Sequence, residues 1–185
     1  MKKTDSIKSR SRLQANVRLL AVAAFFAALS IICGKYLALP IGNVLRFSFE
    51  NLSVLLAGMM LGPLVGAMVG TVADLVGCLM VGYAINPLVT VGAACVGLLG
   101  GLLFRLSSKL PLLWQSCVTV LGTHLIASVL IKTLGLAAYY PEMPLYILLL
   151  WRLLNYTVVA LAEWLLLYTI LKNQALRRRL EALRQ

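Results

Sequence analysis

Charged residues are scarce in this sequence, and their scarcity argues against a soluble fold. Only 12% of the 185 residues are Asp, Glu, Lys or Arg, whereas a soluble domain carries about 25%. Nearly all of the hydrophobic sequence lies between residues 19 and 171, and one helix needs about 20 residues to cross the hydrocarbon core of a bilayer. The middle of the chain therefore has room for several membrane spans and none for a soluble domain.

The sequence also lacks the residue sets that membrane enzymes and ATPases use. His124 is the only histidine, so a metal site with several His ligands is not expected. The four cysteines, Cys33, Cys78, Cys95 and Cys117, stand singly in apolar runs without CxxC spacing, which is typical of small buried side chains. The P-loop pattern GxxxxGK[ST] is absent. We therefore expect no catalytic residues, no cofactor and no metal.

Most of the basic residues gather near the two ends of the chain. One cluster comprises Lys2, Lys3, Lys8, Arg10, Arg12 and Arg18, and the other comprises Lys172, Arg177, Arg178, Arg179 and Arg184. Because both clusters flank hydrophobic segments, they are typical of cytoplasmic charges that set topology and contact anionic membrane lipid, and not of a nucleic-acid site. If both tails are cytoplasmic, the number of membrane crossings must be even.

Turn residues divide the hydrophobic middle into six predicted helices. Their approximate bounds are 18–39, 52–61, 63–83, 88–106, 112–138 and 145–171. The predicted fold class is therefore an all-α integral membrane bundle of six helices, with a short second helix and both ends in the cytoplasm. The predicted parts are a basic tail over 1–17, a membrane domain over 18–171 and a second basic tail over 172–185.

Four glycines recur at four-residue intervals and lead to an aspartate. They are Gly58, Gly62, Gly66 and Gly70, followed by Asp74. Four residues is just over one helical turn, so the series predicts one helical face without side chains, against which another helix can pack closely. A carboxylate at the end of such a face is costly in lipid and is a candidate functional group.

The remaining polar side chains fall mainly at the outer ends of the predicted helices, and the inner half is expected to be almost purely apolar. The candidate ligand-binding residues are Arg46, Asn51, Asp74, Tyr83, Asn86, Lys132, Tyr139, Arg152 and Asn155. Arginine can hold a carboxylate through two bonds, tyrosine can stack on a ring, and Asn and Asp suit the edge of a heterocycle. The set predicts a site for a flat, polar, anionic small molecule. Many of these residues also have a structural interpretation, as interfacial anchors or interhelical hydrogen-bond partners, which we expect for His124 and Glu163.

The stretch ENLSVLLAGMMLGPLVGAMVGTVADLVG, preceded by IGNVLRFSF, resembles the substrate-binding S components of energy-coupling factor (ECF) vitamin transporters, most closely the folate type. The resemblance extends over nearly the whole chain and implies a vitamin-binding subunit, not an enzyme, in a prokaryotic cell membrane. It implies folate as the vitamin. Riboflavin, thiamin, biotin and pantothenate remain alternatives because their S components share the architecture. A structural membrane subunit that binds no small molecule is a further alternative.

The resemblance also implies partners. S components dock on a transmembrane coupling protein through an Ala-x-x-x-Ala face of the first helix, and two ATPase subunits supply ATP hydrolysis. The segment AVAAFFAALS offers two such pairs, Ala23 with Ala27 and Ala24 with Ala28. We expect Ala24 and Ala28 to form the docking face. Ordinary packing of small residues within the bundle is the alternative.

Overall fold

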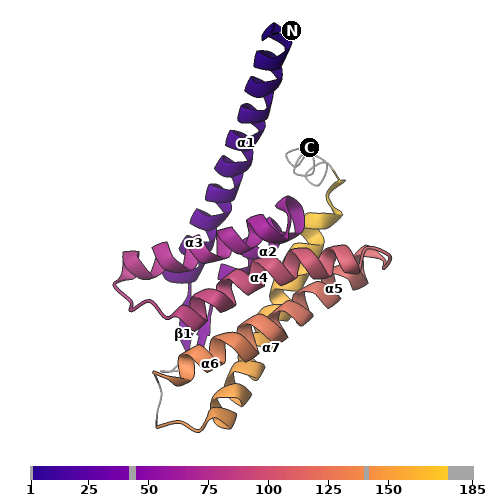
Figure 1. The fold of residues 1–185 in the computed structure, drawn as a ribbon. Coiled ribbons are helices and arrows are strands. Elements are labelled where there is room, and N and C mark those ends of the chain that lie inside the picture. The colour runs from indigo at the N-terminus through magenta and orange to yellow at the C-terminus, as the bar shows by residue number, and fades with distance from the viewer. Residues whose placement is uncertain (1, 42–44, 140–141, 175–185) are drawn as a thin grey trace.

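The structure is a computed structural model that describes residues 2–41, 45–139 and 142–174, with side chains described from residue 16 onward except for 39–46. The chain forms a helical bundle with one small hairpin (Figure 1). The elements in order are α1 (Lys2–Ile31), the π-helical turn η1 (Ile32–Tyr36), strands β1 (Leu39–Ile41) and β2 (Leu45–Phe47), α2 (Glu50–Leu61), α3 (Pro63–Val81), α4 (Pro87–Leu106), α5 (Leu112–Thr123), the π-helical segment η2 (His124–Ile131), α6 (Lys132–Ala137) and α7 (Leu145–Lys172).

Among the described residues, five helices are long and apolar enough to cross a membrane. They are Asn16–Tyr36, Pro63–Val81, Pro87–Leu106, Leu112–Ala137 and Leu145–Lys172. The last two cover the predicted fifth and sixth helices almost to the residue. The sixth apolar helix, α2, has 12 residues and is therefore about 18 Å long, too short to cross a hydrocarbon core of about 30 Å unaided.

Two features of the chain between α1 and α2 differ from the prediction. The first helix ends at Tyr36 and not near residue 39, and β1 pairs with β2 as an antiparallel hairpin in which Pro40 is opposite Arg46. The sequence analysis predicted no strand in the polar stretch between the first two helices. The hairpin leads directly into α2 and so determines where that helix begins.

The sequence spacing predicted that the glycine series lies on one helical face. The structure divides the series between two helices. Gly62 has φ 110°, which ends α2, and Pro63 begins α3. A proline is well suited to the first turn of a helix because its missing N–H would have no intrahelical partner there. The chain therefore folds back at Gly62, and Gly58 and Gly66 face each other across the turn, so that a Cβ on Gly66 would lie 2.5 Å from the Cα of Gly58.

Glycines bring α2, α3 and α4 into close contact. A Cβ on Gly97 of α4 would collide with the carbonyl of Gly66 on α3, and a Cβ on Gly70 would collide with the carbonyl of Ala93. Helices that lack side chains at their contact can approach until their backbones touch, which increases dispersion contacts where lipid offers no hydrophobic driving force. The three helices consequently form the compact part of the bundle.

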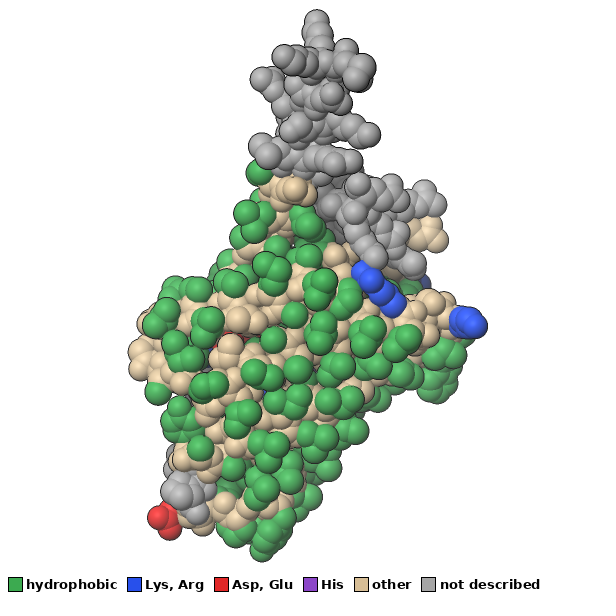
Figure 2. Space-filling model, viewed as in Figure 1, with side chains coloured by type: hydrophobic (Ala, Val, Ile, Leu, Met, Phe, Trp, Pro, Cys, Tyr) green, Lys and Arg blue, Asp and Glu red, His purple; other side chains and the backbone are tan. Residues whose placement is uncertain are grey.

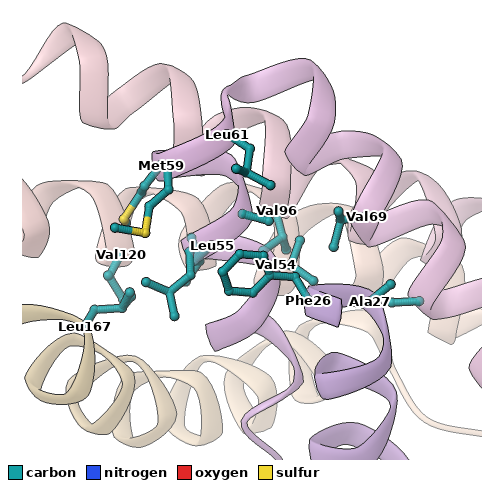
Figure 3. Packing of buried hydrophobic residues seen from close by; sticks show 14 of the residues in the cluster. Phe26, Ala27, Val54, Leu55, Met59, Leu61, Val69, Val96, Val120 and Leu167 are labelled. Atoms are coloured by element: carbon teal, nitrogen blue, oxygen red, sulfur yellow. The ribbon is translucent and has the colours of Figure 1, made fainter. Parts of the chain in front are cut away.

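Helix α2 lies at the centre of the core. Ten of its twelve residues are buried, and Leu55 is fully enclosed. Figure 3 shows Val54 and Leu55 of α2 beside Phe26 of α1 and Val96 of α4. A helix that is apolar on all sides is a buried helix, and this explains why a segment so short is stable between longer ones.

The outer surface is dominated by hydrophobic side chains, which Figure 2 shows on the visible face. Leu64 is 75% exposed and Leu79 is 69% exposed. Such continuous apolar surface is expected of a protein that faces lipid and not water. The chain is therefore a multi-pass membrane protein.

The N-terminal end of α1 and the C-terminal end of α7 lie on the same side of the bundle, at the top of Figure 1. Helix α1 begins at Lys2, so the predicted tail over 1–17 continues into the first span without a break. Residues 175–185, most of the predicted C-terminal tail, lie outside the described residues.

The span Leu112–Ala137, which is the predicted fifth helix, carries a stripe of buried polar side chains. The sequence analysis named only two of them, His124 and Lys132. The members of the stripe are Gln115, Ser116, Thr119, Thr123, His124, Ser128, Lys132 and Thr133. Several bond to backbone: Thr119 donates to the carbonyl of Gln115 at 2.7 Å, and Gln115 donates to that of Phe104 at 2.7 Å. The predicted interhelical bonds of His124 and Glu163 are confirmed, because His124 Nε2 lies 2.7 Å from Glu163 Oε2.

Candidate functional site

A small cavity collects ionisable side chains from four different segments, η1, α2, α3 and α6. Its volume is about 20 Å³, enough for about one water molecule. Its walls are formed by Ser30, Ile31, Lys35, Glu50, Asn51, Val54, Gly70, Ala73, Asp74, Ala93 and Lys132. Two carboxylates and two ammonium groups so close together inside an apolar bundle are costly without a function, so this cavity is the candidate site.

Lys132 is the centre of the polar contacts in this cavity. Its Nζ donates to Glu50 Oε1 at 3.1 Å and to Asn51 Oδ1 at 3.3 Å. The Lys132 side chain is 6% exposed and that of Glu50 is 29% exposed. The ion pair links the first residue of α2 to the first residue of α6, which are far apart in the sequence. Asn51 Nδ2 is buried and has no hydrogen-bond partner among the described residues, so it is a donor available to a ligand.

Asp74 occupies another wall of the cavity and is held by the neighbouring helix. Thr90 Oγ1 donates to Asp74 Oδ2 at 2.7 Å, and it also lies 3.1 Å from the carbonyl oxygen of Asn86. This bond joins α3 to α4 at the end of the glycine contact. Asp74 therefore makes an interhelical hydrogen bond and also lines the cavity. Its role in ligand binding stays a prediction.

Three glycines give the long charged side chains room to reach the cavity. A Cβ on Gly34 would lie 2.8 Å from Glu50 Cβ, and one on Gly77 would lie 2.8 Å from Lys35 Cε. A Cβ on Gly92 would collide with the Cγ of Lys132. Each charged stem passes over backbone that carries no side chain.

Lys35 and Tyr83 extend the site at its edge. Lys35 Nζ lies 5.5 Å from the centre of the Tyr83 ring, a distance at which a cation and an aromatic face attract each other. Tyr83 is 54% exposed. The ring is thus exposed at the edge of the cavity, and its role in stacking on a ligand stays a prediction.

Asn86, a predicted ligand residue, makes structural bonds on both sides of its amide. Its Oδ1 accepts from the backbone N–H groups of Leu88 and Val89 at 3.0 and 3.4 Å, and its Nδ2 donates to the carbonyl of Gly135 at 2.7 Å. The first pair caps α4 and the third joins α4 to α6. Its role in ligand binding stays a prediction.

Other predicted residues do not line this cavity. Arg152 Nη2 donates to the carbonyl of Ser128 at 2.9 Å, and its guanidinium lies 5.0 Å from the Tyr156 ring. Asn155 is buried on α7, and Tyr139 is 51% exposed at the end of α6. The side chain of Arg46 lies outside the described residues.

A second cavity of about 170 Å³ lies between η2 and α7. It is larger, yet its lining is mainly aliphatic, with His124, Tyr156 and Thr157 as its polar members. His124 already contacts Glu163 at 2.7 Å and Ser128 at 3.2 Å. We therefore place the candidate site in the smaller cavity, where the charges are.

The two alanine pairs of α1 face in different directions. Ala27 is buried in the core, whereas Ala24 and Ala28 are both exposed. The exposed pair is the one that the sequence analysis favoured, and its role in docking stays a prediction.

The sequence model for the ECF-type riboflavin transporter S component matches residues 14–173. The chain belongs to this family. It also shares its fold with the solved structure titled "Crystal structure of FolT bound with folic acid", at a TM-score of 0.64 and 20% identity over 80% of this chain and 89% of that chain. No curated protein sequence matches.

In this S component the candidate cavity includes some of the predicted site residues and some that the sequence analysis did not name as such. It brings together Asn51, Asp74 and Lys132, with Tyr83 at its edge, and it also includes Lys35, Glu50 and Ser30. A signal for Glu50 was present, because it stands beside Asn51 at the start of a helix that is otherwise apolar.

Proposed function

We propose that this chain is the vitamin-binding S subunit of an ECF transporter in a prokaryotic plasma membrane, and that the vitamin binds in the charged cavity around Lys132. The observation that carries this proposal is the buried Lys132–Glu50 ion pair beside the open donor of Asn51. A family of transporter components needs a substrate site, and this cavity holds the mixed donors and acceptors that a vitamin requires.

Binding requires the cavity to open. Its 20 Å³ is far below the roughly 300–1,000 Å³ of ligand pockets. Strands β1 and β2 come just before Glu50 in the chain, and the loop after α3 follows the helix that carries Asp74, so both segments adjoin helices that line the cavity. We propose that these segments move outward to admit the vitamin, while the tightly packed α2, α3 and α4 stay fixed.

Folate is the vitamin that we propose first. Its pterin ring offers N–H donors to the carboxylates of Glu50 and Asp74, and its ring carbonyl can accept from Asn51 Nδ2 or Lys132. Its glutamate carboxylates suit Lys35 on the cavity wall. The fold shared with a protein solved with folic acid agrees with this choice.

Riboflavin is the second candidate, because the family model is named for it. Riboflavin is neutral, and the charges of the cavity balance as two lysines against two carboxylates. The polar edge of its ring, however, places a carbonyl on either side of one N–H. That edge suits donors better than it suits two carboxylates.

Transport itself would depend on partners. The chain contains no P-loop pattern, so we propose that two ATPase subunits supply the energy through a transmembrane coupling protein docked on Ala24 and Ala28. The vitamin would enter from the extracellular side, and the coupled complex would deliver it inward.

Calorimetric titration of the purified chain tests the proposal. We expect submicromolar folate binding, with riboflavin and thiamin weaker, and about a 10- to 100-fold loss of affinity in Lys132→Met because the ring carbonyl of the ligand loses a charged hydrogen-bond donor. The matched control is Lys109→Met, which removes an exposed lysine from the α4–α5 loop and should leave affinity unchanged. A folded protein that binds none of the five vitamins would instead indicate a structural subunit.

A further inference from the structure

The Lys132–Glu50 ion pair occupies the position that a ligand would have to take. Both side chains line the cavity, and the space beside them is too small for a ring. A ligand that enters must therefore separate the pair or lie against both of its members. The question is which of the two groups can turn toward a ligand without leaving a charge buried alone.

We propose that Glu50 is a ligand-binding residue that Lys132 holds in place until the vitamin enters, and that its carboxylate then binds a heterocycle edge bearing two adjacent N–H donors. This inference rests on the proposed function and names the chemical class of the substrate. Glu50 is absent from the residues that the sequence analysis assigned to the site.

Lys132 can release Glu50 because it has a second acceptor. Its Nζ also donates to Asn51 Oδ1 at 3.3 Å, and that bond does not depend on Glu50. A buried ammonium without any partner would be costly, but the amide oxygen remains, and a carbonyl of the ligand can become its new acceptor.

Glu50 can move because of its surroundings. Its side chain is 29% exposed, whereas that of Lys132 is 6% exposed. It passes over Gly34, where a Cβ would lie 2.7 Å from Glu50 Oε2, so residue 34 itself places no side chain against it. Its backbone stays fixed, since Ser30 Oγ donates to the carbonyl of Glu50 at 2.8 Å.

Asp74 is the competing carboxylate, and it is less free to serve this purpose. Thr90 donates to its Oδ2 at 2.7 Å, and that bond fastens α3 to α4. Binding two donors side by side requires both oxygens of a carboxylate. Asp74 would have to give up its interhelical bond, whereas Glu50 would exchange the Lys132 ammonium for the two N–H donors of the ligand.

The geometry selects a 2-amino-4-oxo ring over a 2,4-dioxo ring. The first presents an amino group next to a ring N–H, and both donate to one carboxylate. The second presents a carbonyl where the amino group would be, and this oxygen would face the Glu50 oxygens. The remaining ring carbonyl suits Asn51 Nδ2, which has no hydrogen-bond partner among the described residues.

Pterin and lumazine provide the test, because they differ in this one substituent. Calorimetry of the full chain should show pterin binding at least about 100-fold more tightly than lumazine, since a site built for N–H donors rejects an analogue that lacks one. In Glu50→Gln the preference should fall at least about tenfold, because an amide presents one acceptor and one donor group. The control Glu142→Gln removes an exposed acid from the loop before α7 and should keep the full preference.

A second variant separates a loss of ligand preference from a loss of folding. Glu50→Gln leaves Lys132 with one partner, so the double variant Glu50→Gln/Lys132→Met is measured beside it, and it should also lose the preference. Glu50→Gln with the wild-type preference would overturn the inference, as would loss of the preference in Asp74→Asn alone. If folded wild-type protein binds no vitamin and neither ring, the proposed function itself fails.

Discussion

Lys132 shows how one residue can join distant parts of a membrane protein. Its stem crosses α4 at Gly92, and its ammonium reaches Glu50 and Asn51 at the start of α2. A larger residue at position 92 would collide with that stem. The glycine is therefore as necessary to the cavity as the lysine, although it contributes no polar atom.

Asn86 is the residue for which structural and ligand-binding roles are easiest to separate. We expect Asn86→Ala to destabilise the protein by about 0.5–2 kcal/mol through the lost helix cap, with further loss from the bond to Gly135. Asn86→Asp keeps the capping oxygen and removes only the donor to Gly135, so it should be less destabilised. Thermal unfolding in detergent measures both.

Folate titration of the two Asn86 variants decides the other role. A purely structural Asn86 predicts nearly unchanged affinity in the folded fraction. A loss of more than about tenfold in Asn86→Asp, with little change in melting temperature, would show that the amide contacts the ligand.

At the scale of elements, α1 has two faces with different tasks. Ala27 and Phe26 pack into the core, and Ala24 and Ala28 remain exposed. A flat alanine face gives a partner helix close backbone approach and no deep interlocking. That is suitable for a subunit that must dock and release within lipid.

Ala24→Trp tests this face. We expect uptake by cells that carry the coupling subunits to be abolished while vitamin binding by the purified chain stays intact, because the indole blocks docking and touches no core residue. Leu161→Trp, on the exposed side of α7, is the control and should keep uptake. Lost binding in Ala24→Trp would mean a folding defect instead.

The turn at Gly62 determines how α2 and α3 pack against each other. It converts one predicted glycine face into two facing helices, so that Gly58 and Gly66 meet at a point where α4 also arrives through Gly97. The spacing of four residues is the same in both arrangements. Only the φ of 110° at Gly62 distinguishes them.

At the scale of the whole molecule, polarity is unevenly distributed. The cavity lies at the η1 end of the first span, where Lys35 lines it. The N-terminal end of α1 and the C-terminal end of α7 lie together on the other side of the bundle (Figure 1). If the basic tails are cytoplasmic, the cavity opens outward, where an uptake subunit must meet its vitamin.

Cysteine labelling of intact cells tests this orientation. In a chain whose four native cysteines are replaced, Glu142→Cys should react with an impermeant maleimide from outside, and Lys109→Cys should react only after the cells are opened. The two positions are exposed in loops at opposite ends of α5–α6. The reverse pattern would place the cavity on the cytoplasmic side and contradict the uptake mechanism.

The sequence alone determined the class of this protein and the approximate bounds of its helices. Hydrophobic length, proline and glycine act locally, so Pro63, Asn86–Pro87 and Pro144 mark helix starts in the sequence as they do in the structure. The same local information indicated that Asn51, Asp74 and Lys132 were costly to bury and therefore candidates.

Only the tertiary structure decided which polar residues share a site. Glu50 and Lys132 are 82 residues apart, and no local pattern encodes their contact. Whether Lys35 extends to the lipid surface or into the cavity depends on the room above Gly77 of another helix. Arg152 looked equally suited to a ligand, yet the helix it faces directs it to Ser128. The direction of each of these side chains depends on how close the helix backbones lie, and that distance is a property of the packed bundle.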